Sequence, residues 1–477
     1  MSNQPNILIV TTDQQHHAMM SCAGNEWLST PNMDRIAARG VRYERAYCSN
    51  PVCVPSRFSW WTGRMPSAIG MRQNGGVKGA LPSEIHEGAM GHLVSQAGYR
   101  AVFAGKIHLP GDLAPESMGF EYLCSDERYR LAVECARFIR EQGGAQTAGG
   151  AAAGIAAPGG AERPWLLVAN FINPHDICHH ALTEFATTDF EKLLVSKVTD
   201  ARASVDGMLD LAKRWDEEEF FAKHCPPLPP NYDPQEDEPE AIAELVDYRP
   251  FRRKARDRWG EREWRLHRWV YHRLTERVDE QIGVLLDALE TSGQADNTVV
   301  IFTSDHGDHD SSHRLEHKTI FYEEAARVPL LVADPHADAA TPGSSIGTGL
   351  VQTGLDLMAT VCDYAGVDSP AHNLGMSLRP SATGESARAP RDGVYAENEV
   401  SYMYVTEEHK FVRYDRGANG RQLYDLVRDP AETRNWIGEP GNDEIARELE
   451  TRLDAEKARH DALSLADRVE PPQPAAH

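Results

Sequence analysis

Cys53-Val54-Pro55-Ser56-Arg57, continued through Phe58 to Thr62-Gly63-Arg64, is the stretch around which this sequence is organised. Pro55 suits the first position of a helix, which places Ser56 and Arg57 in its first turn. Free backbone N–H groups and the helix dipole favour an anion there, and the Arg57 guanidinium can hold an oxyanion through two hydrogen bonds. The stretch therefore predicts an anion site beside Cys53. The alternative is a buried structural cysteine before an ordinary helix.

The extended pattern Cys-x-Pro-Ser-Arg-x4-Thr-Gly-Arg at 53–64 resembles the signature of the type I sulfatases, the formylglycine enzymes of the alkaline-phosphatase superfamily. The resemblance implies that a formylglycine-generating enzyme oxidises Cys53 to Cα-formylglycine, whose aldehyde hydrates to a geminal diol. One hydroxyl would attack sulfur as the nucleophile. Loss of the proton from the other hydroxyl would then expel sulfate, a step that an unmodified thiol cannot perform.

Composition narrows the possible partners. The 477 residues are 41% hydrophobic and 25% charged, which is typical of a globular protein with one large domain and a smaller one. The formal net charge of -23 argues against nucleic acid and anionic membranes as partners. An anionic substrate would therefore have to be captured by a local cluster of cations. Nothing in the sequence indicates the oligomeric state.

The cellular compartment is predicted from the signal-peptide, membrane-spanning and disulfide patterns for which we searched the sequence. The segment after Met1 has no basic region followed by an apolar core, and no apolar run approaches membrane-spanning length. Eight cysteines are scattered without Cys-x-x-Cys spacing, so a disulfide framework is not expected. We predict a cytoplasmic protein without a membrane partner.

Polar motifs follow four predicted strands, at the point where each strand ends. The apolar runs are 6–11, 100–104, 165–171 and 298–303, and they lead to Asp13, Gly105-Lys106-Ile107-His108, Asn173-Pro174-His175 and Ser304-Asp305-His306. Such runs are typical of buried parallel strands, whose carboxyl ends meet at one edge of a sheet. We therefore predict an α/β fold with a predominantly parallel central sheet flanked by helices, and one active site at its edge. The resemblance implies that this fold is alkaline-phosphatase-like.

The predicted domains are a catalytic α/β domain over 1–385 and a C-terminal α+β subdomain over 386–461. Within the first, a helix is expected from Ser83 through Leu93 to Ala97, and a Gly/Ala-rich flexible insertion over 143–163. The mixed stretch Thr188 to Asp257 is expected to lie over the sheet ends and shape a pocket, and substrate choice is expected to depend on the variable parts 110–164 and 180–261. Residues 462–477 are predicted to form a disordered tail.

Metal ligands are predicted at Asp13, Asp305 and His306, with Cys53 facing the same ion. The resemblance makes Ca²⁺ the expected cation, which would polarise the sulfate ester. A single Asp with an Asp-His pair is similar to the choline sulfatases and phosphonate monoester hydrolases, some of which hold Mn²⁺. A nitrogen ligand also shifts preference toward Mn²⁺, so both metals stay open. Taken singly, each residue could instead be an ordinary loop residue.

The resemblance assigns further roles by motif. Lys106 would neutralise the sulfate, and His108 would hydrogen-bond a hydroxyl of the diol and help remove its proton. His175 would contact the ester oxygen and could protonate the leaving group, and Lys318 would bridge substrate and metal-site oxygens. Asn74 is a weaker match to a polar substrate contact. Singly, such lysines and histidines are ordinary surface or loop residues.

The function predicted from the sequence is hydrolysis of a sulfate monoester, on a sugar or another small organic alcohol. The alternative within the superfamily is a phosphonate monoester or phosphodiester hydrolase with the same nucleophile. A non-catalytic sulfosugar-binding protein belongs to another class, but it would be expected to lose Cys53 or a metal ligand, and this chain retains them.

Overall fold

An eight-stranded sheet forms the centre of the protein in this computed structural model, which describes residues 4–77, 79–147, 163–337, 345–347, 349–385 and 391–469. The strand order is β5-β4-β6-β1-β7-β8-β2-β9. The bounds in that order are Glu121–Cys124, Arg100–Gly105, Trp165–Pro174, Asn6–Asp13, Thr298–Ser304, Leu330–Ala333, Val41–Tyr43 and Ser345–Gly347. The run from β5 to β7 is parallel, and β8 pairs antiparallel with both neighbours. The predicted fold class is confirmed.

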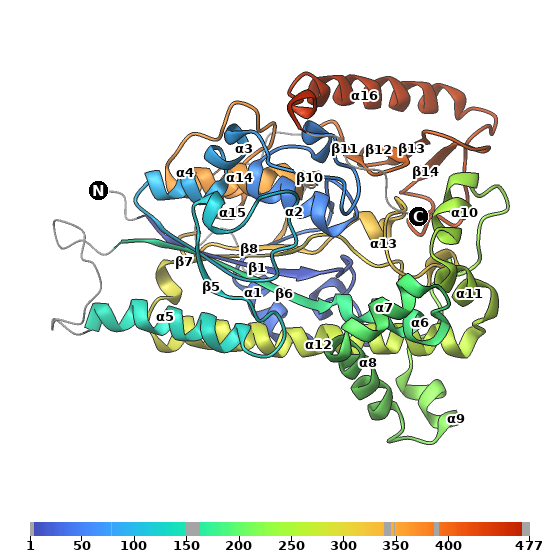
Figure 1. Ribbon diagram of the computed structural model, residues 1–477, viewed down its shortest axis with the longest axis horizontal. Helices are drawn as coiled ribbons and strands as arrows, with labels where there is room; N and C mark the ends of the chain where they lie inside the picture. Colours follow the sequence, from blue (N-terminus) through green and yellow to red (C-terminus); the bar gives the residue numbers. More distant parts are fainter. Residues whose placement is uncertain are drawn as a thin grey trace.

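Helices cover both faces of the sheet (Figure 1). Along β1, Ile7 and Ile9 pack on one face and Leu8 and Val10 on the other, because successive side chains of a strand point to opposite faces. Both sets are apolar, so both faces need a cover. One layer contains α2 (Cys53–Thr62), α4 (Met90–Gln96) and α14 (Thr353–Ala365). The other contains α1 (Pro31–Ala38), α5 (Leu131–Thr147) and the long α12 (Glu261–Thr291).

A smaller antiparallel sheet follows in the C-terminal part of the chain. Its strands are β11 (Val394–Glu397), β12 (Ser401–Val405), β13 (His409–Tyr414) and β14 (Arg421–Asp425), in sequential order. The helix α16 (Asp443–Asp461) lies across it, with Leu449 and Leu453 packed against Tyr404 and Phe411. This agrees with the predicted α+β character, while the proposed boundary at 385/386 adjoins residues 386–390, which lie outside the described residues.

Helices from residues 178 to 258 gather at one end of the molecule (Figure 1). They are α6 (Cys178–Phe185), α7 (Asp189–Lys197), α8 (Thr199–Ala212), α9 (Glu217–Glu219), α10 (Glu240–Asp247) and α11 (Pro250–Arg258). Since α6 follows directly after β6 and its short turn, this group begins at the carboxyl end of the sheet. Among the described residues, no helix combines the length and apolarity needed to cross a membrane.

Three local predictions differ from the structure. The helix expected from Ser83 to Ala97 is broken into α3 (Ser83–Glu87) and α4, with Gly88 ending the first piece. The start of the predicted flexible insertion, 143–147, extends α5, and 148–162 lie outside the described residues. The predicted tail begins as ordered chain, since the Leu465 N–H donates to the Ala68 carbonyl at 2.7 Å and a 3-10 helix follows.

Candidate active site

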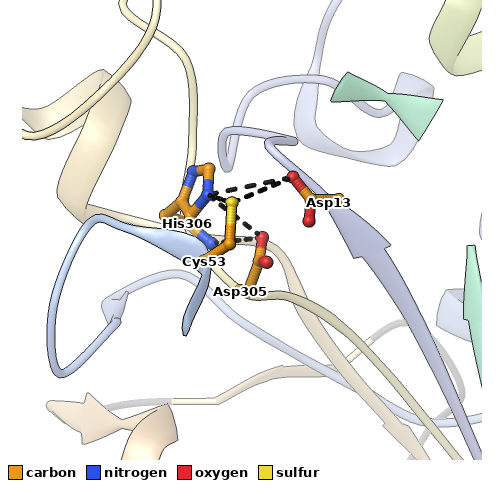
Figure 2. Close-up of side chains that lie close together, drawn as sticks. All are labelled: Asp13, Cys53, Asp305 and His306. Carbon is orange, nitrogen blue, oxygen red and sulfur yellow. Dashed lines mark hydrogen bonds and ion pairs between the residues drawn. The ribbon is translucent and has the colours of Figure 1, made fainter. Parts of the chain in front are cut away.

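Three chain segments bring Asp13, Cys53, Asp305 and His306 together at the carboxyl edge of the sheet (Figure 2). Asp13 is the last residue of β1, Asp305 directly follows β7, and Cys53 begins α2. The Cys53 Sγ lies 3.2 Å from His306 Nε2 and 3.7 Å from Asp13 Oδ1. All four side chains are fully buried. The convergence predicted from strand-end positions is thus present.

The chemistry of this set fits a divalent cation. The His306 Nδ1 lies 2.8 Å from the Gly307 carbonyl, which requires a proton on Nδ1 and leaves the Nε2 lone pair facing the cluster. That Nε2 lies 3.8 Å from Asp13 Oδ1 and 3.5 Å from Asp305 Oδ1. Burial, and then the charge of Asp13, raises the pKa of Asp305 to about 6. A bound cation would relieve this repulsion between two buried carboxylates.

Arg57 differs from its predicted position beside the substrate. It is fully buried, its Nε donates to Asp305 Oδ2 at 2.8 Å, and one terminal nitrogen donates to Asp13 Oδ2 at 3.1 Å. The other terminal nitrogen faces the Lys106 carbonyl and Asn170 Oδ1. The guanidinium therefore binds both carboxylates from the interior of the protein. Its planar set of N–H donors fixes their orientation, and it does not bind an oxyanion of the substrate as predicted.

The helix after the motif begins earlier than expected. Cys53 is the first residue of α2, so Pro55 occupies its third position and not its first. The backbone N–H of Val54 donates to Asn74 Oδ1 at 3.0 Å, which satisfies one free amide of the first turn. Ser56 donates from Oγ to the Asp305 carbonyl at 2.6 Å. Asn74 thus caps the helix from an exposed position next to Cys53.

Two lysines point at the same centre. Lys318 Nζ donates to Cys53 Sγ at 2.9 Å, and Lys106 Nζ lies 2.5 Å from Asp13 Oδ2. Burial alone would raise the pKa of the Cys53 thiol, but Lys318 and Lys106 hold it well below its usual value. The two ammonium groups therefore stabilise a negative charge at the position of the Cys53 Sγ atom.

The two predicted histidines lie on the open side of this centre. His108 is exposed, has φ +45°, and is among the groups that lower the pKa of Cys53. His175 keeps 21% of its side-chain exposure, with Nε2 4.0 Å from Asp13 Oδ1. Burial, and then Lys106, lowers the pKa of His175 to about 3. His175 is thus a neutral imidazole at pH 7, and not a group that titrates near neutrality as predicted.

Two residues of the site were missed by sequence reasoning. Gln14 has φ +70°, accepts from Lys318 Nζ at 2.8 Å, and donates from its backbone N–H to Asp305 Oδ1. Asn170 lies inside β6 and accepts from Thr11 Oγ1 at 2.7 Å beside the Arg57 guanidinium. The position of Gln14 directly after Asp13 was an available signal. Asn170, a polar residue within an apolar run, was another.

A second group of possible metal ligands is formed by His175, Asp176 and His179. Its carboxylate is already paired, because Arg128 donates to both Asp176 oxygens at 2.7 and 3.2 Å. A cation there would meet the guanidinium charge at close range. We therefore do not assign a second metal to this group.

Comparison with known proteins gives one consistent picture. A model of the sulfatase family matches residues 5–367, and a model described as "N-sulphoglucosamine sulphohydrolase, C-terminal" matches residues 311–459. A Delta 4,5-hexuronate-2-O-sulfatase of Bacteroides thetaiotaomicron is 29% identical over 473 residues, which cover 94% of this chain and 88% of the relative.

Solved structures agree with that picture. A 2-O GAG sulfatase superposes with a TM-score of 0.75 at 26% identity, over 96% of this chain and 93% of the other. The phosphonate monoester hydrolase of Agrobacterium radiobacter gives a TM-score of 0.68 at 19% identity, over 96% of both chains. The second likeness is one of fold alone.

Proposed function

Since the chain belongs to the sulfatase family and is an enzyme that hydrolyses sulfate esters, we propose that it acts on a sulfated sugar through Cys53 converted to formylglycine and a divalent cation. The observation that carries this proposal is the convergence of Cys53 Sγ, Lys318 Nζ and three metal-ligand types at one buried point. There Sγ stands in for the hydroxyl oxygens of the hydrated aldehyde.

The metal and the modified residue supply chemistry that the chain alone lacks. A cation held by Asp13, Asp305 and His306 would polarise the sulfate ester, while hydrated formylglycine would provide a hydroxyl nucleophile. Ca²⁺ is the cation that the family resemblance favours, and the His306 nitrogen supports Mn²⁺ as the alternative. A formylglycine-generating enzyme is then a required partner for maturation.

Side chains of the protein stabilise charge, orient the substrate and transfer the proton. Lys318, at 2.9 Å from Cys53 Sγ, and Lys106, at 2.5 Å from Asp13 Oδ2, offset the negative charge that develops on the sulfate oxygens. His175 orients the ester oxygen through Nε2, and His108 takes up the hydroxyl proton whose loss releases sulfate. Arg57 keeps both metal-binding carboxylates ionised and fixed.

A sugar substrate is supported by the first relative, whose name gives a hexuronate 2-O-sulfate as its substrate. The likeness extends over 94% of this chain. The helices of 178–258 begin at the carboxyl end of the sheet, where α6 follows β6, and they can therefore supply side chains that contact a sugar ring.

A side-by-side assay tests the proposal. The purified enzyme, loaded with Ca²⁺ or Mn²⁺, is offered p-nitrophenyl sulfate, sulfated mono- and disaccharides that include a 2-O-sulfated unsaturated hexuronate, a phosphonate monoester and a phosphodiester. We expect the highest kcat/KM on a sulfated sugar and none in Cys53→Ala. Preference for the phosphonate or phosphodiester would instead favour the alternative hydrolase.

A further inference from the structure

Glu316 and His317 form a tight pair directly before Lys318. The Glu316 Oε2 and His317 Nδ1 atoms lie 2.6 Å apart, and the Glu316 side chain is 2% exposed. Arg252, from α11, approaches the other carboxylate oxygen at 3.4 Å. None of these contacts is used by the reaction described above. A buried carboxylate on one ring nitrogen is the arrangement that orients an imidazole for work at the other nitrogen.

The backbone holds this pair in a fixed place relative to Cys53. His317 and Thr319 have φ values of +73° and +93°, which are rare for residues with a side chain. The His317 carbonyl accepts from the His309 N–H at 2.8 Å, and the Thr319 N–H donates to the Pro51 carbonyl at 3.1 Å. The segment that carries Lys318 is thereby tied to the loop at His309 on one side of the lysine and to the loop that carries Cys53 on the other.

The contact with Glu316 engages Nδ1 of His317 and leaves the other ring nitrogen, Nε2, available. Among the described residues Nε2 has no hydrogen-bond partner, and the side chain keeps 14% exposure. Phe251 packs against the ring, with centroids 6.0 Å apart. Burial, and then the charges of Arg252, Lys318 and His179, holds the pKa of His317 well below its usual value, while Cys53 acts in the opposite direction. Groups on α11, on α6 and at the nucleophile therefore surround this imidazole.

The protonation pattern follows from these neighbours. Arg252 and Lys318 both favour the ionised form of Glu316, although burial raises its pKa to about 7. When Glu316 is ionised it accepts the proton of Nδ1–H, and the neutral ring then keeps its lone pair on Nε2. Such a lone pair accepts a hydrogen bond from a hydroxyl.

We propose that His317, oriented by Glu316, accepts a hydrogen bond from a sugar hydroxyl next to the scissile sulfate ester. This inference rests on the proposed function, since it concerns the alcohol part of the same substrate. His317 is then a substrate-contacting residue that selects polyhydroxyl alcohols, and Glu316 is a positioning residue that acts through it.

The test compares two substrates that differ in hydroxyl groups. p-Nitrophenyl sulfate offers none, whereas the best sulfated sugar of the assay above offers several. The variants are His317→Ala, His317→Asn and Glu316→Gln, with His336→Ala, an exposed histidine elsewhere, as the matched control. Asn tolerates positive φ, so His317→Asn keeps the backbone even if the alanine variant folds poorly.

We expect KM for the sugar to rise by about tenfold in both His317 variants, the scale of one hydrogen bond, with kcat little changed. Turnover of p-nitrophenyl sulfate should stay within about twofold of the wild type. Glu316→Gln, whose amide oxygen can still accept from Nδ1–H, should show a smaller rise than His317→Ala.

Two results would overturn the inference. One is an unchanged sugar KM in an active His317→Ala enzyme, and the other is an equal loss on both substrates, which marks a structural role. Absence of wild-type activity on p-nitrophenyl sulfate and every sulfated sugar would overturn the proposed function itself, and this inference with it.

Discussion

Arg57 shows how one buried residue determines the geometry of the site. Its guanidinium donates to Asp305 and Asp13, and all three side chains have zero exposure. Charges so deeply buried are tolerated only when paired, and removal of one partner leaves an uncompensated charge. The planar fork can satisfy two carboxylates at once, which the single ammonium of lysine cannot do in the same geometry.

We therefore expect Arg57→Lys to lose bound metal and to lower kcat/KM by about 10² or more, because both carboxylates lose their fixed orientation. Metal analysis and steady-state kinetics on one preparation measure both quantities. Lys213→Arg, an exchange at an exposed ion pair, is the control. An Arg57→Lys enzyme with full metal content and normal kcat/KM would contradict this assignment.

At the scale of elements, a buried lysine joins the C-terminal sheet to the catalytic part. Lys410 of β13 has no exposure and lies 3.1 Å from Glu323 Oε1 and 2.5 Å from Glu432 Oε1. Glu323 begins the short helix α13 (Glu323–Ala326), which follows the Lys318 segment, and Tyr47 donates to it at 3.1 Å. Two carboxyl groups thus share one ammonium where β13 meets α13.

Lys410→Met should lower the free energy of unfolding by about 3–5 kcal/mol, the scale for removal of one partner from a buried ion pair. Urea unfolding measures it. Lys457→Met is the matched control, since Lys457 pairs with Asp461 on the surface of α16 and should cost under about 0.5 kcal/mol. Equal stability of both variants would show that the buried pair does not couple the sheets.

Elements were predictable where the sequence carries a local signal. The apolar runs identified β1, β4, β6 and β7, and the rule that parallel strands end at one edge brought Asp13 and Asp305 together. The break between α3 and α4 was missed, because apolar residues continue on both sides of Gly88.

The direction of Arg57 could not be inferred from its helix. Its partners lie 44 and 248 residues away in sequence, so only the tertiary fold decides whether the guanidinium faces substrate or carboxylates. The same holds for the Glu316–His317 pair. Its neighbour Arg252 comes from α11, inside the stretch in which the motifs said least.

At the scale of the whole molecule, the net charge of -23 repels an anionic substrate. It also disfavours the burial of further negatively charged groups in the interior. Arg57, Lys106 and Lys318 supply positive charge at the active site. Two carboxylates and a histidine at the same place are available to hold a cation. Metal binding should therefore stabilise the fold as well as the reaction.

Chelation should lower Tm, and Ca²⁺ or Mn²⁺ should restore it, because an ion that binds only the folded state adds about 2.7 kcal/mol at a hundred times Kd. Thermal unfolding with EDTA and after metal return measures this. His306→Ala should abolish the metal-dependent part of the shift. The same Tm with and without metal would contradict a resident cation at this centre.

The central claim is tested most directly by tandem mass spectrometry of the tryptic peptide from Ala46 to Arg57, combined with kcat/KM on a sulfate ester. This peptide carries both Cys48 and Cys53, so Cys48, a buried cysteine outside the Cys-x-Pro-Ser-Arg motif, is an internal control. We predict an aldehyde at Cys53, a thiol at Cys48, and kcat/KM proportional to the aldehyde fraction across preparations. Full activity with an unmodified thiol at Cys53 would contradict the account.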